Sequence, residues 1–376
     1  MNGTIHTPRE KIETGALVIE GKTIVGIGRA QDLAIPPGAE QIDATGLAVT
    51  PGLIDMHTYG CLGVQLTAPG RVSEELAQLS QNMARFGVTG FLISVPMGSP
   101  EFIKEIMQAI AESIQNLGKG ARCLGIHLEG PYLDPDQRGA FPLDVLREPN
   151  VVELGGWADA ANGYLRVVTL APNLTNSSEC ARFLRERKII PSLGHTSTDY
   201  KQAHQALAPQ GDFTLVTHLF NAMTGMHHRN PGVVGAVLAS NVPAMLICDG
   251  EHVHPAVVKV ITRAKTTERV ILVTDAIAGA GIAEGRFSLF DQPVYVNHGR
   301  AQLADGTLAG SVLTLNCAVI NARDFAGLAF GDALKMATAN PARLLELEAK
   351  GMLSIGADAD VVMMDEQTGD VTMTMV

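Results

Sequence analysis

Eight short apolar runs, spread over residues 52–276, constrain the fold of this chain most strongly. The runs are GLIDMH, TGFLISV, CLGIHLEG, LRVVTLAP, IIPSLGH, TLVTHLF, AMLICDG and VILVTDA. Most are separated by stretches with apolar residues at helical spacing, such as EELAQLSQNMARF and EFIKEIMQAIAESIQNL. Strands that alternate with helices in this way are typical of a (β/α)8 TIM-like barrel. A doubly wound open sheet is the weaker alternative, because no glycine-rich phosphate turn follows the first run.

Both ends of the chain have the pattern of β structure. Near the N-terminus, the apolar runs GALVIE and TIVGIG are joined by Gly21-Lys22, which suits a tight hairpin turn. Near the C-terminus, the stretch GMLSIGADADVVMMD combines turn residues with a strand-like run. Neither end can bury a face alone. We therefore expect a small β-sandwich domain formed from residues 1–50 and 352–376, with the barrel formed by residues 51–351.

Composition excludes several functional classes. The chain has 376 residues, enough for two domains, and a formal net charge of −11, which argues against nucleic acid as a partner. Its apolar runs are too short to span a membrane, and the N-terminal segment MNGTIHTPRE is polar. The five cysteines include no C-x-x-C pair, so we expect no disulfide framework and a cytoplasmic location. A small anionic substrate would need a local cluster of basic groups.

Polar residues stand where the predicted strands end. They are His57, Glu129, His195, His218, Asp249 and Asp275. In a (β/α)8 barrel, the carboxyl ends of the strands share one face, and active sites lie on that face. A single histidine after an apolar run is more often a hydrogen-bonded core residue. So many polar residues in phase with eight strands instead indicate a metal site.

The types of these residues suggest a hydrolytic centre. Glu129, His195 and His218 offer one carboxylate oxygen and two imidazole nitrogens, a set that suits Zn²⁺ or Fe²⁺ and leaves a position for water. Asp275 could accept a proton from that water and pass it to a leaving amine. The alternative for Asp275 is a helix N-cap, since the segment TDAIAGAG begins a turn.

Several longer motifs occur in a recognisable order over nearly the whole chain. They are PGLIDMHTYG, HLEGPYL, LGHTSTDY, THLFNAMTGMHHRNPG, CDGEHVHP, LVTDAIAGAG, GTLAGSVLTLN and ATANPARLL. In these motifs the chain resembles the N-acetylglucosamine-6-phosphate deacetylase family of the amidohydrolase superfamily. The resemblance implies a (β/α)8 barrel with a small β domain from both termini, and a homodimer. It also implies hydrolysis of the acetamide of N-acetylglucosamine-6-phosphate to glucosamine-6-phosphate and acetate.

The resemblance also assigns roles to individual residues. It implies that Glu129, His195 and His218 bind the metal and that Asp275 is the catalytic acid/base. The residues implied to contact the sugar phosphate are Ala140, Asn221, Ala222, Arg229, His252, Leu308, Ala309, Gly310 and Ser311. The arginine is implied to reach across a dimer interface. His227-His228-Arg229 is the most basic patch near the expected site, and the guanidinium suits a phosphate.

Two positions depart from the family pattern. Tyr59 stands where a His-x-His pair would have its second histidine. We therefore expect one divalent metal per chain, with His57 facing the substrate or supporting the ligands. Phe141 stands where the family has a histidine thought to polarise the acetyl carbonyl, and phenylalanine cannot donate a hydrogen bond. His57 or the metal would then polarise the carbonyl, unless the substrate differs.

Two other functions remain open from the sequence. One is a deacylase of the same barrel type that acts on N-acetylgalactosamine-6-phosphate or on an N-acyl amino acid. The other is a non-catalytic binding protein derived from the barrel, which fold alone does not exclude. Such a protein should have lost ligands or the base, yet all four residues are present.

Overall fold

The eight apolar runs form the eight strands of one parallel sheet, in a computed structural model that describes residues 1–8 and 10–376. These strands are β5 (Leu53–Thr58), β8 (Val88–Ser94), β9 (Arg122–Glu129), β10 (Leu165–Leu170), β11 (Ile190–Leu193), β12 (Leu215–Val216), β13 (Ala244–Ile247) and β14 (Val270–Val273). They neighbour one another in chain order. Strands such as β13 and β14 are apolar and buried throughout, as expected for parallel strands covered on both faces. The predicted (β/α)8 barrel is confirmed.

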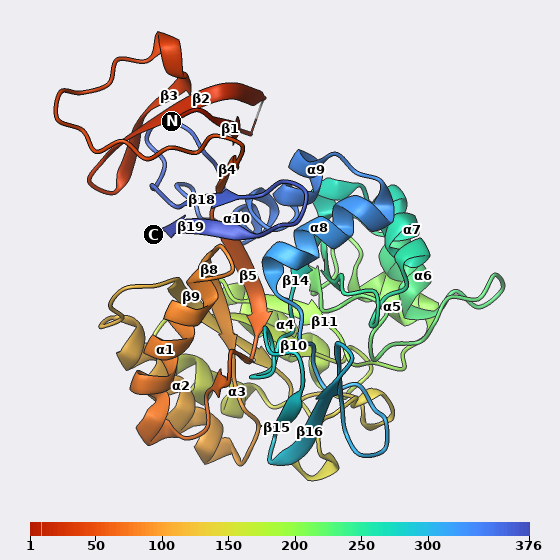
Figure 1. The fold of residues 1–376 in the computed structure, drawn as a ribbon. Coiled ribbons are helices and arrows are strands. Elements are labelled where there is room, and N and C mark those ends of the chain that lie inside the picture. Colours follow the sequence, from red (N-terminus) through yellow and green to blue (C-terminus); the bar gives the residue numbers. More distant parts are fainter. Residues whose placement is uncertain (9) are drawn as a thin grey trace.

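Helices follow the strands and cover the barrel (Figure 1). Their bounds are α1 (Val72–Ala84), α2 (Pro100–Ile114), α3 (Val151–Ala160), α4 (Ser177–Glu186), α5 (Tyr200–Ala206), α6 (Gly232–Ala239), α7 (Pro255–Lys265), α8 (Leu315–Ala326), α9 (Phe330–Lys335) and α10 (Ala339–Leu344). Helix α2 shows why these segments are helical. The Ser99 hydroxyl accepts a hydrogen bond from the backbone N–H of Phe102, and Pro100 occupies the first turn. Ile103, Ile106 and their neighbours at helical spacing are buried against the sheet.

The barrel closes between its first and last strands without a continuous ladder. At the carboxyl ends, the backbone N–H of Asp275 donates to the carbonyl of His57 over 2.8 Å. At the opposite ends, the chain between α9 and α10 lies between the two strands. There Leu272 N–H donates to the Met336 carbonyl and Ile54 N–H donates to the Ala337 carbonyl. The closure therefore fixes the backbone of two of the polar residues predicted to form the site.

The two chain ends form a second sheet of six strands, in the order β19-β18-β4-β1-β2-β3. The strands are β1 (Gly3–His6), β2 (Lys11–Glu20), β3 (Thr23–Arg29), β4 (Ala48–Pro51), β18 (Val361–Met364) and β19 (Val371–Met375). Gly21 has a φ of +61° in the predicted hairpin turn. The sheet has its own apolar cluster, so a small β domain from both termini is confirmed. The boundaries at residues 1–50, 51–351 and 352–376 stay a prediction.

Short strands interrupt the barrel repeat after β5 and after β14. The pair β6 (Gly60–Cys61) and β7 (Val64–Gln65) follows β5. A three-stranded sheet of β15 (Gly285–Leu289), β16 (Gln292–Asn297) and β17 (Arg300–Gln302) lies between β14 and α8. In Figure 1, β5 runs away from the small terminal sheet and toward β15 and β16. The inserted sheet therefore lies at the carboxyl ends of the barrel strands.

Two further features bear on the predicted class. Among the residues that the structure describes, no helix combines the length and the apolar character needed to span a membrane. The five cysteines are free thiols, four of them buried. A hollow of about 550 Å³ lies against the small terminal sheet. Its lining is largely apolar and comes from residues 1–49 and 361–375, so it is separate from the strand ends described next.

Candidate metal and active site

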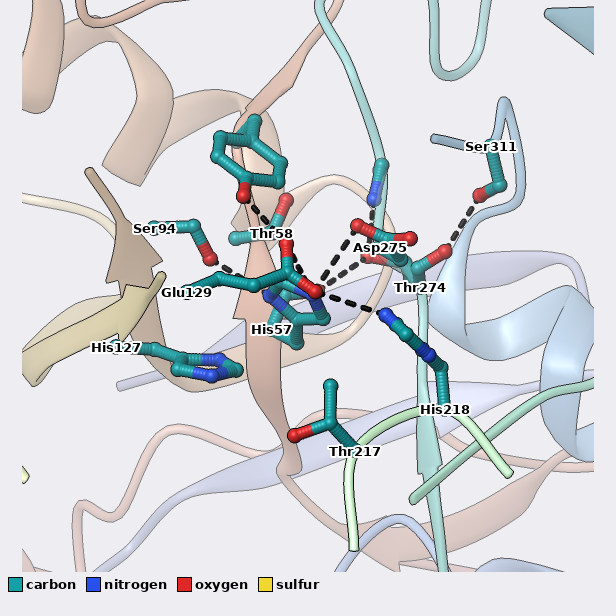
Figure 2. A network of polar contacts seen from close by, with 12 residues as sticks. His57, Thr58, Ser94, His127, Glu129, Thr217, His218, Thr274, Asp275 and Ser311 are labelled. Carbon is teal, nitrogen blue, oxygen red and sulfur yellow. Dashed lines mark hydrogen bonds and ion pairs between the residues drawn. The ribbon is translucent and has the colours of Figure 1, made fainter. Parts of the chain in front are cut away.

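The carboxyl ends of the barrel strands bring the predicted polar residues together. Glu129 is the last residue of β9, while His195, His218 and Asp275 each lie two residues beyond β11, β12 and β14. Their exposed fractions are 2%, 4%, 3% and 8%. Figure 2 shows Glu129, His218 and Asp275 pointing toward His57 of β5. Side chains that are far apart in the sequence therefore meet in one buried cluster, as the strand-end pattern predicts.

Three of these side chains form a group with metal-ligand geometry. The Glu129 Oε1 atom lies 2.8 Å from His218 Nε2 and 3.1 Å from His195 Nε2, and the two imidazole nitrogens are 3.1 Å apart. His195 Nδ1 lies 2.8 Å from the Gln137 carbonyl, which can only accept a hydrogen bond. The proton of a neutral His195 ring is therefore on Nδ1, and its Nε2 presents a lone pair to the cluster. Glu129, His195 and His218 could together hold a divalent cation.

Three site residues have a left-handed backbone. The φ angles of His195, His218 and Asp275 are +47°, +25° and +50°. Residues other than glycine rarely adopt this conformation, and such strain clusters at functional sites. The Asp275 backbone is fixed by the bond to His57 and by the Ser311 N–H, which donates to the Asp275 carbonyl over 2.8 Å. Among the described residues no helix begins at Asp275, because the next element is β15, so the N-cap alternative is wrong.

His57 is fully buried between the two carboxylates of the site. Its Nε2 atom lies 3.3 Å from Glu129 Oε2 and 3.2 Å from Asp275 Oδ1, and its Nδ1 atom is 2.7 Å from the Ser94 hydroxyl. Burial disfavours the charged ring, but the two carboxylates outweigh burial and raise the pKa of His57 to about 9. A positive ring is therefore favoured here while no cation is bound. His57, His218 and Asp275 also form a second group of potential ligands.

The two carboxylates respond differently to this environment. Burial would raise the pKa of Glu129, but the charge on His57 and hydrogen bonds from the three histidines hold it well below its ordinary value. Burial raises the pKa of Asp275, with the Glu129 charge adding to this effect and His57 opposing it. Glu129 is therefore the fixed anion of the site, and Asp275 is the carboxylate that more readily takes a proton.

Tyr59 donates a hydrogen bond to Glu129. Its hydroxyl lies 2.5 Å from Glu129 Oε2, and its side chain is buried. Burial and the charges of Glu129 and Asp275 raise the pKa of Tyr59, so the phenol stays neutral and serves as a donor. One oxygen of Glu129 thus faces Tyr59 and His57 while the other faces His195 and His218.

The residues predicted to contact a sugar phosphate lie around this cluster, with one exception. Asn221 and Ala222 lie three and four residues after His218, and His252 lies near enough to Asp275 to lower the pKa of this carboxyl. The segment 308–311 lies against Asp275 through Ser311. Ala140 is buried and its carbonyl accepts a hydrogen bond from Gln292 over 2.7 Å. The exception is Arg229, which is exposed on the loop before α6 that projects at the right of Figure 1.

Several residues that support the site had no role predicted from the sequence. Ser94 holds His57, and Asp249 Oδ2 lies 2.6 Å from His252 Nδ1. The role of Asp249 could have been predicted, because this residue ends an apolar run three residues before His252. Ser94 is the last residue of β8 and the penultimate residue of the predicted run TGFLISV, but serine is too common there to stand out. Phe290 stacks on Phe141, and no sequence pattern indicated that contact.

Comparison with known proteins identifies the family. The model of the amidohydrolase family matches residues 48–376, which include the whole barrel and every member of the polar cluster. The chain belongs to the amidohydrolase family. This amidohydrolase is therefore a hydrolase, and the resemblance noted in its motifs is confirmed.

Individual relatives of this amidohydrolase are similar over most of their length. N-acetylglucosamine-6-phosphate deacetylase of Lysinibacillus sphaericus is 34% identical over 333 residues, covering 88% of this chain and 84% of the relative. N-acetylgalactosamine-6-phosphate deacetylase of Escherichia coli O157:H7 is 36% identical over 335 residues, covering 88% and 86%. A solved structure of a mutant N-acetyl-D-glucosamine-6-phosphate deacetylase from Mycobacterium smegmatis, in complex with N-acetyl-D-glucosamine-6-phosphate, has a TM-score of 0.90 and 31% identity. The match covers 99% of this chain and 96% of the Mycobacterium smegmatis chain.

Proposed function

We propose that the protein hydrolyses the acetamide of N-acetylglucosamine-6-phosphate to glucosamine-6-phosphate and acetate, as a step in amino sugar catabolism. One observation carries this proposal. The buried carboxylate of Asp275 lies beside a group of one carboxylate and two imidazoles that suits a divalent cation. Amide hydrolysis needs both an activated water and a group that transfers its proton to the amine.

Each residue of the site has a separate part in the proposed reaction. A divalent cation held by Glu129, His195 and His218 would lower the pKa of a water and polarise the substrate carbonyl. Asp275 accepts the proton of the attacking water as the oxygen bonds to the carbonyl carbon. It then donates that proton to the nitrogen as the carbon–nitrogen bond breaks, which releases acetate and the amine. His57 lies 3.2 Å from Asp275 Oδ1 and orients this carboxylate.

The supporting assignments follow from the same proposal. One divalent cation per chain, Zn²⁺ or Fe²⁺, fits a ligand set of one carboxylate and two imidazoles. Asn221, Ala222, His252 and the segment 308–311 would contact the sugar. Burial opposes a charge on His252, but Asp249 raises the pKa of this ring, and a positive ring suits a phosphorylated substrate. We further propose a homodimer in the cytoplasm.

A turnover panel tests the function. Wild-type protein, purified with its metal, would be assayed for acetate release from N-acetylglucosamine, N-acetylgalactosamine, their 6-phosphates and an N-acetylamino acid. We expect the 6-phosphates to be hydrolysed with the highest kcat/KM. Binding of a 6-phosphate without acetate release would favour the non-catalytic alternative, and a preference for the amino acid would overturn the sugar phosphate assignment.

A second sugar is supported by a specific observation. The E. coli O157:H7 relative that is named for N-acetylgalactosamine-6-phosphate is 36% identical, while the Lysinibacillus relative named for the gluco epimer is 34% identical. A difference of two percentage points in sequence identity does not decide between the two sugars, which differ only in the configuration at C4. In the same panel, a higher kcat/KM for the galacto epimer would replace the first proposal with this second one.

Arg229 provides a separate test of the phosphate. The side chain is exposed. One nitrogen of its guanidinium lies 2.7 Å from His228 Nε2, and the other donors can meet an anion brought to this loop. A hydrogen bond to a charged group contributes about 1.5–3 kcal/mol, so Arg229→Ala should lower kcat/KM for a 6-phosphate by about 10–100-fold. The unphosphorylated sugar should be affected little.

The control for this prediction is Arg263→Ala, which removes an arginine from the last turn of α7. Equal losses on phosphorylated and unphosphorylated sugars would show that Arg229 is structural. If Arg229 acts from the other subunit of a dimer, a variant that is monomeric by light scattering should show the same selective loss.

A further inference from the structure

The turn between β15 and β16 has an unusual residue pair. Leu289 and Gln292 are opposite each other in the ladder, so Phe290 and Asp291 form a two-residue turn. Their φ angles are +51° and +59°. Turns of this type favour Asn-Gly, and a bulky residue in the left-handed region is strained. A strained residue that persists is a reason to ask what its side chain does.

The Phe290 ring reaches the residues of the polar cluster through two other rings. It stacks on Phe141, with ring centroids 4.6 Å apart, and meets the edge of Tyr59 at 5.4 Å. Phe141 in turn lies edge-on to His195 at 5.3 Å, and Tyr59 donates to Glu129. The three aromatic rings therefore form a continuous apolar wall beside two of the proposed metal ligands.

Polar contacts fix the hairpin in this position. The Gln292 amide donates to the carbonyl of Ala140, which precedes Phe141, over 2.7 Å. The Gln65 amide donates to the Ser288 carbonyl over 2.8 Å. The tip of the hairpin is thus tied both to the loop after β9 and to the segment after β5. These contacts hold the Phe290 ring against Phe141 and Tyr59, so the ring does not lie at a free hairpin end.

The barrel order places this wall beside Ala140 but away from two of the other proposed sugar contacts, Asn221 and His252. Tyr59 and Phe141 follow β5 and β9, whereas Asn221 and His252 follow β12 and β13. In a ring of eight strands in chain order, β9 lies across from β13. A sugar on the side of β12 and β13 whose carbonyl reaches the Glu129, His195 and His218 group would direct its acyl group toward the aromatic wall.

We propose that Phe290 and Phe141 form the wall of the acyl site and restrict it to a short acyl group. This inference rests on the proposed deacetylase function. The methyl of an acetyl group matches an apolar ring surface, and a longer chain would have to displace the stacked pair. Each methylene in an apolar pocket changes selectivity by roughly 10–200-fold. A wall that excludes one or two extra methylenes would therefore decide which acyl length is hydrolysed.

The test is the ratio of kcat/KM for N-butyryl- to N-acetylglucosamine-6-phosphate. Phe290→Ala should raise this ratio by at least about tenfold, and Phe141→Ala should raise it in the same direction. The matched control is Phe287→Ala in the same hairpin, since the Phe287 ring faces Gly279 and Gly285 instead of the wall. Its ratio should equal that of the wild type.

A further variant separates selectivity from folding. Phe290→Asn removes the ring but suits the left-handed turn, so it should stay folded and keep the metal content of the wild type while raising the ratio. An unchanged ratio in folded Phe290→Asn and Phe141→Ala would overturn the proposal. Failure of the wild type to release acetate from either sugar phosphate would instead overturn the proposed function.

Discussion

Asp275→Asn is expected to lower kcat for acetate release by about 10²–10⁴-fold, the range that general acid–base groups contribute. Asparagine has nearly the same shape but cannot accept the proton of the attacking water. It also tolerates the left-handed backbone of this position, where φ is +50°. The backbone bonds to His57 and Ser311 do not involve the carboxylate. The variant should therefore stay folded and keep its metal and its substrate affinity.

Steady-state kinetics, elemental analysis and calorimetric titration with substrate would measure these three properties. Asp305→Asn, in an exposed turn, makes the same chemical change away from the site and should behave as wild type. A folded Asp275→Asn protein that keeps more than about a tenth of the wild-type kcat would remove this residue from the acid–base role.

His195→Gln is expected to abolish metal binding and activity together. The His195 Nε2 lone pair faces Glu129 and His218, and its Nδ1 is fixed by the Gln137 carbonyl, so an amide cannot reproduce the ligand. His57→Gln should instead retain about one equivalent of metal, because Glu129, His195 and His218 already form a complete set of three protein ligands. Its rate should fall through poorer orientation of Asp275.

Elemental analysis of the wild type and both variants distinguishes this prediction from a two-metal site. The structure makes that comparison worthwhile, because His57, His218 and Asp275 also lie within reach of one common ion. About two equivalents in the active wild type, falling to about one in His57→Gln, would show that His57 is a ligand. The hydrogen bond from Tyr59 to Glu129 would then coexist with a second metal.

The sequence could predict the barrel and the core of the site because both depend on local patterns. Each of the eight apolar runs became a strand, and each strand end of a parallel barrel lies on the same face. Glu129, His195, His218 and Asp275 could therefore be grouped without any knowledge of their distances. The hairpin around Gly21 was predicted for the same reason, since its turn chemistry is contained in two residues.

The contacts that the sequence could not predict join segments without a shared pattern. Tyr59 and Glu129 are 70 positions apart, and nothing in the tyrosine's neighbours indicates a buried acceptor. Phe290 lies in an insertion that interrupts the barrel repeat, so strand order alone did not place it near Phe141. Such pairs depend on the paths of loops, which periodicity does not describe.

Strand β4 pairs with strands from both ends of the chain, so one of its partners is translated long before the other. It pairs with β1 on one side and with β18 on the other, and the facing residues Thr50 and Val362 are 312 positions apart. At translation rates of 5–20 residues per second, β4 leaves the ribosome roughly 15–60 s before its second partner exists. Throughout that interval the nascent chain carries an open strand edge, which is a template for pairing with other chains. Strand β18 thus protects an edge of the sheet that was translated about 300 residues earlier.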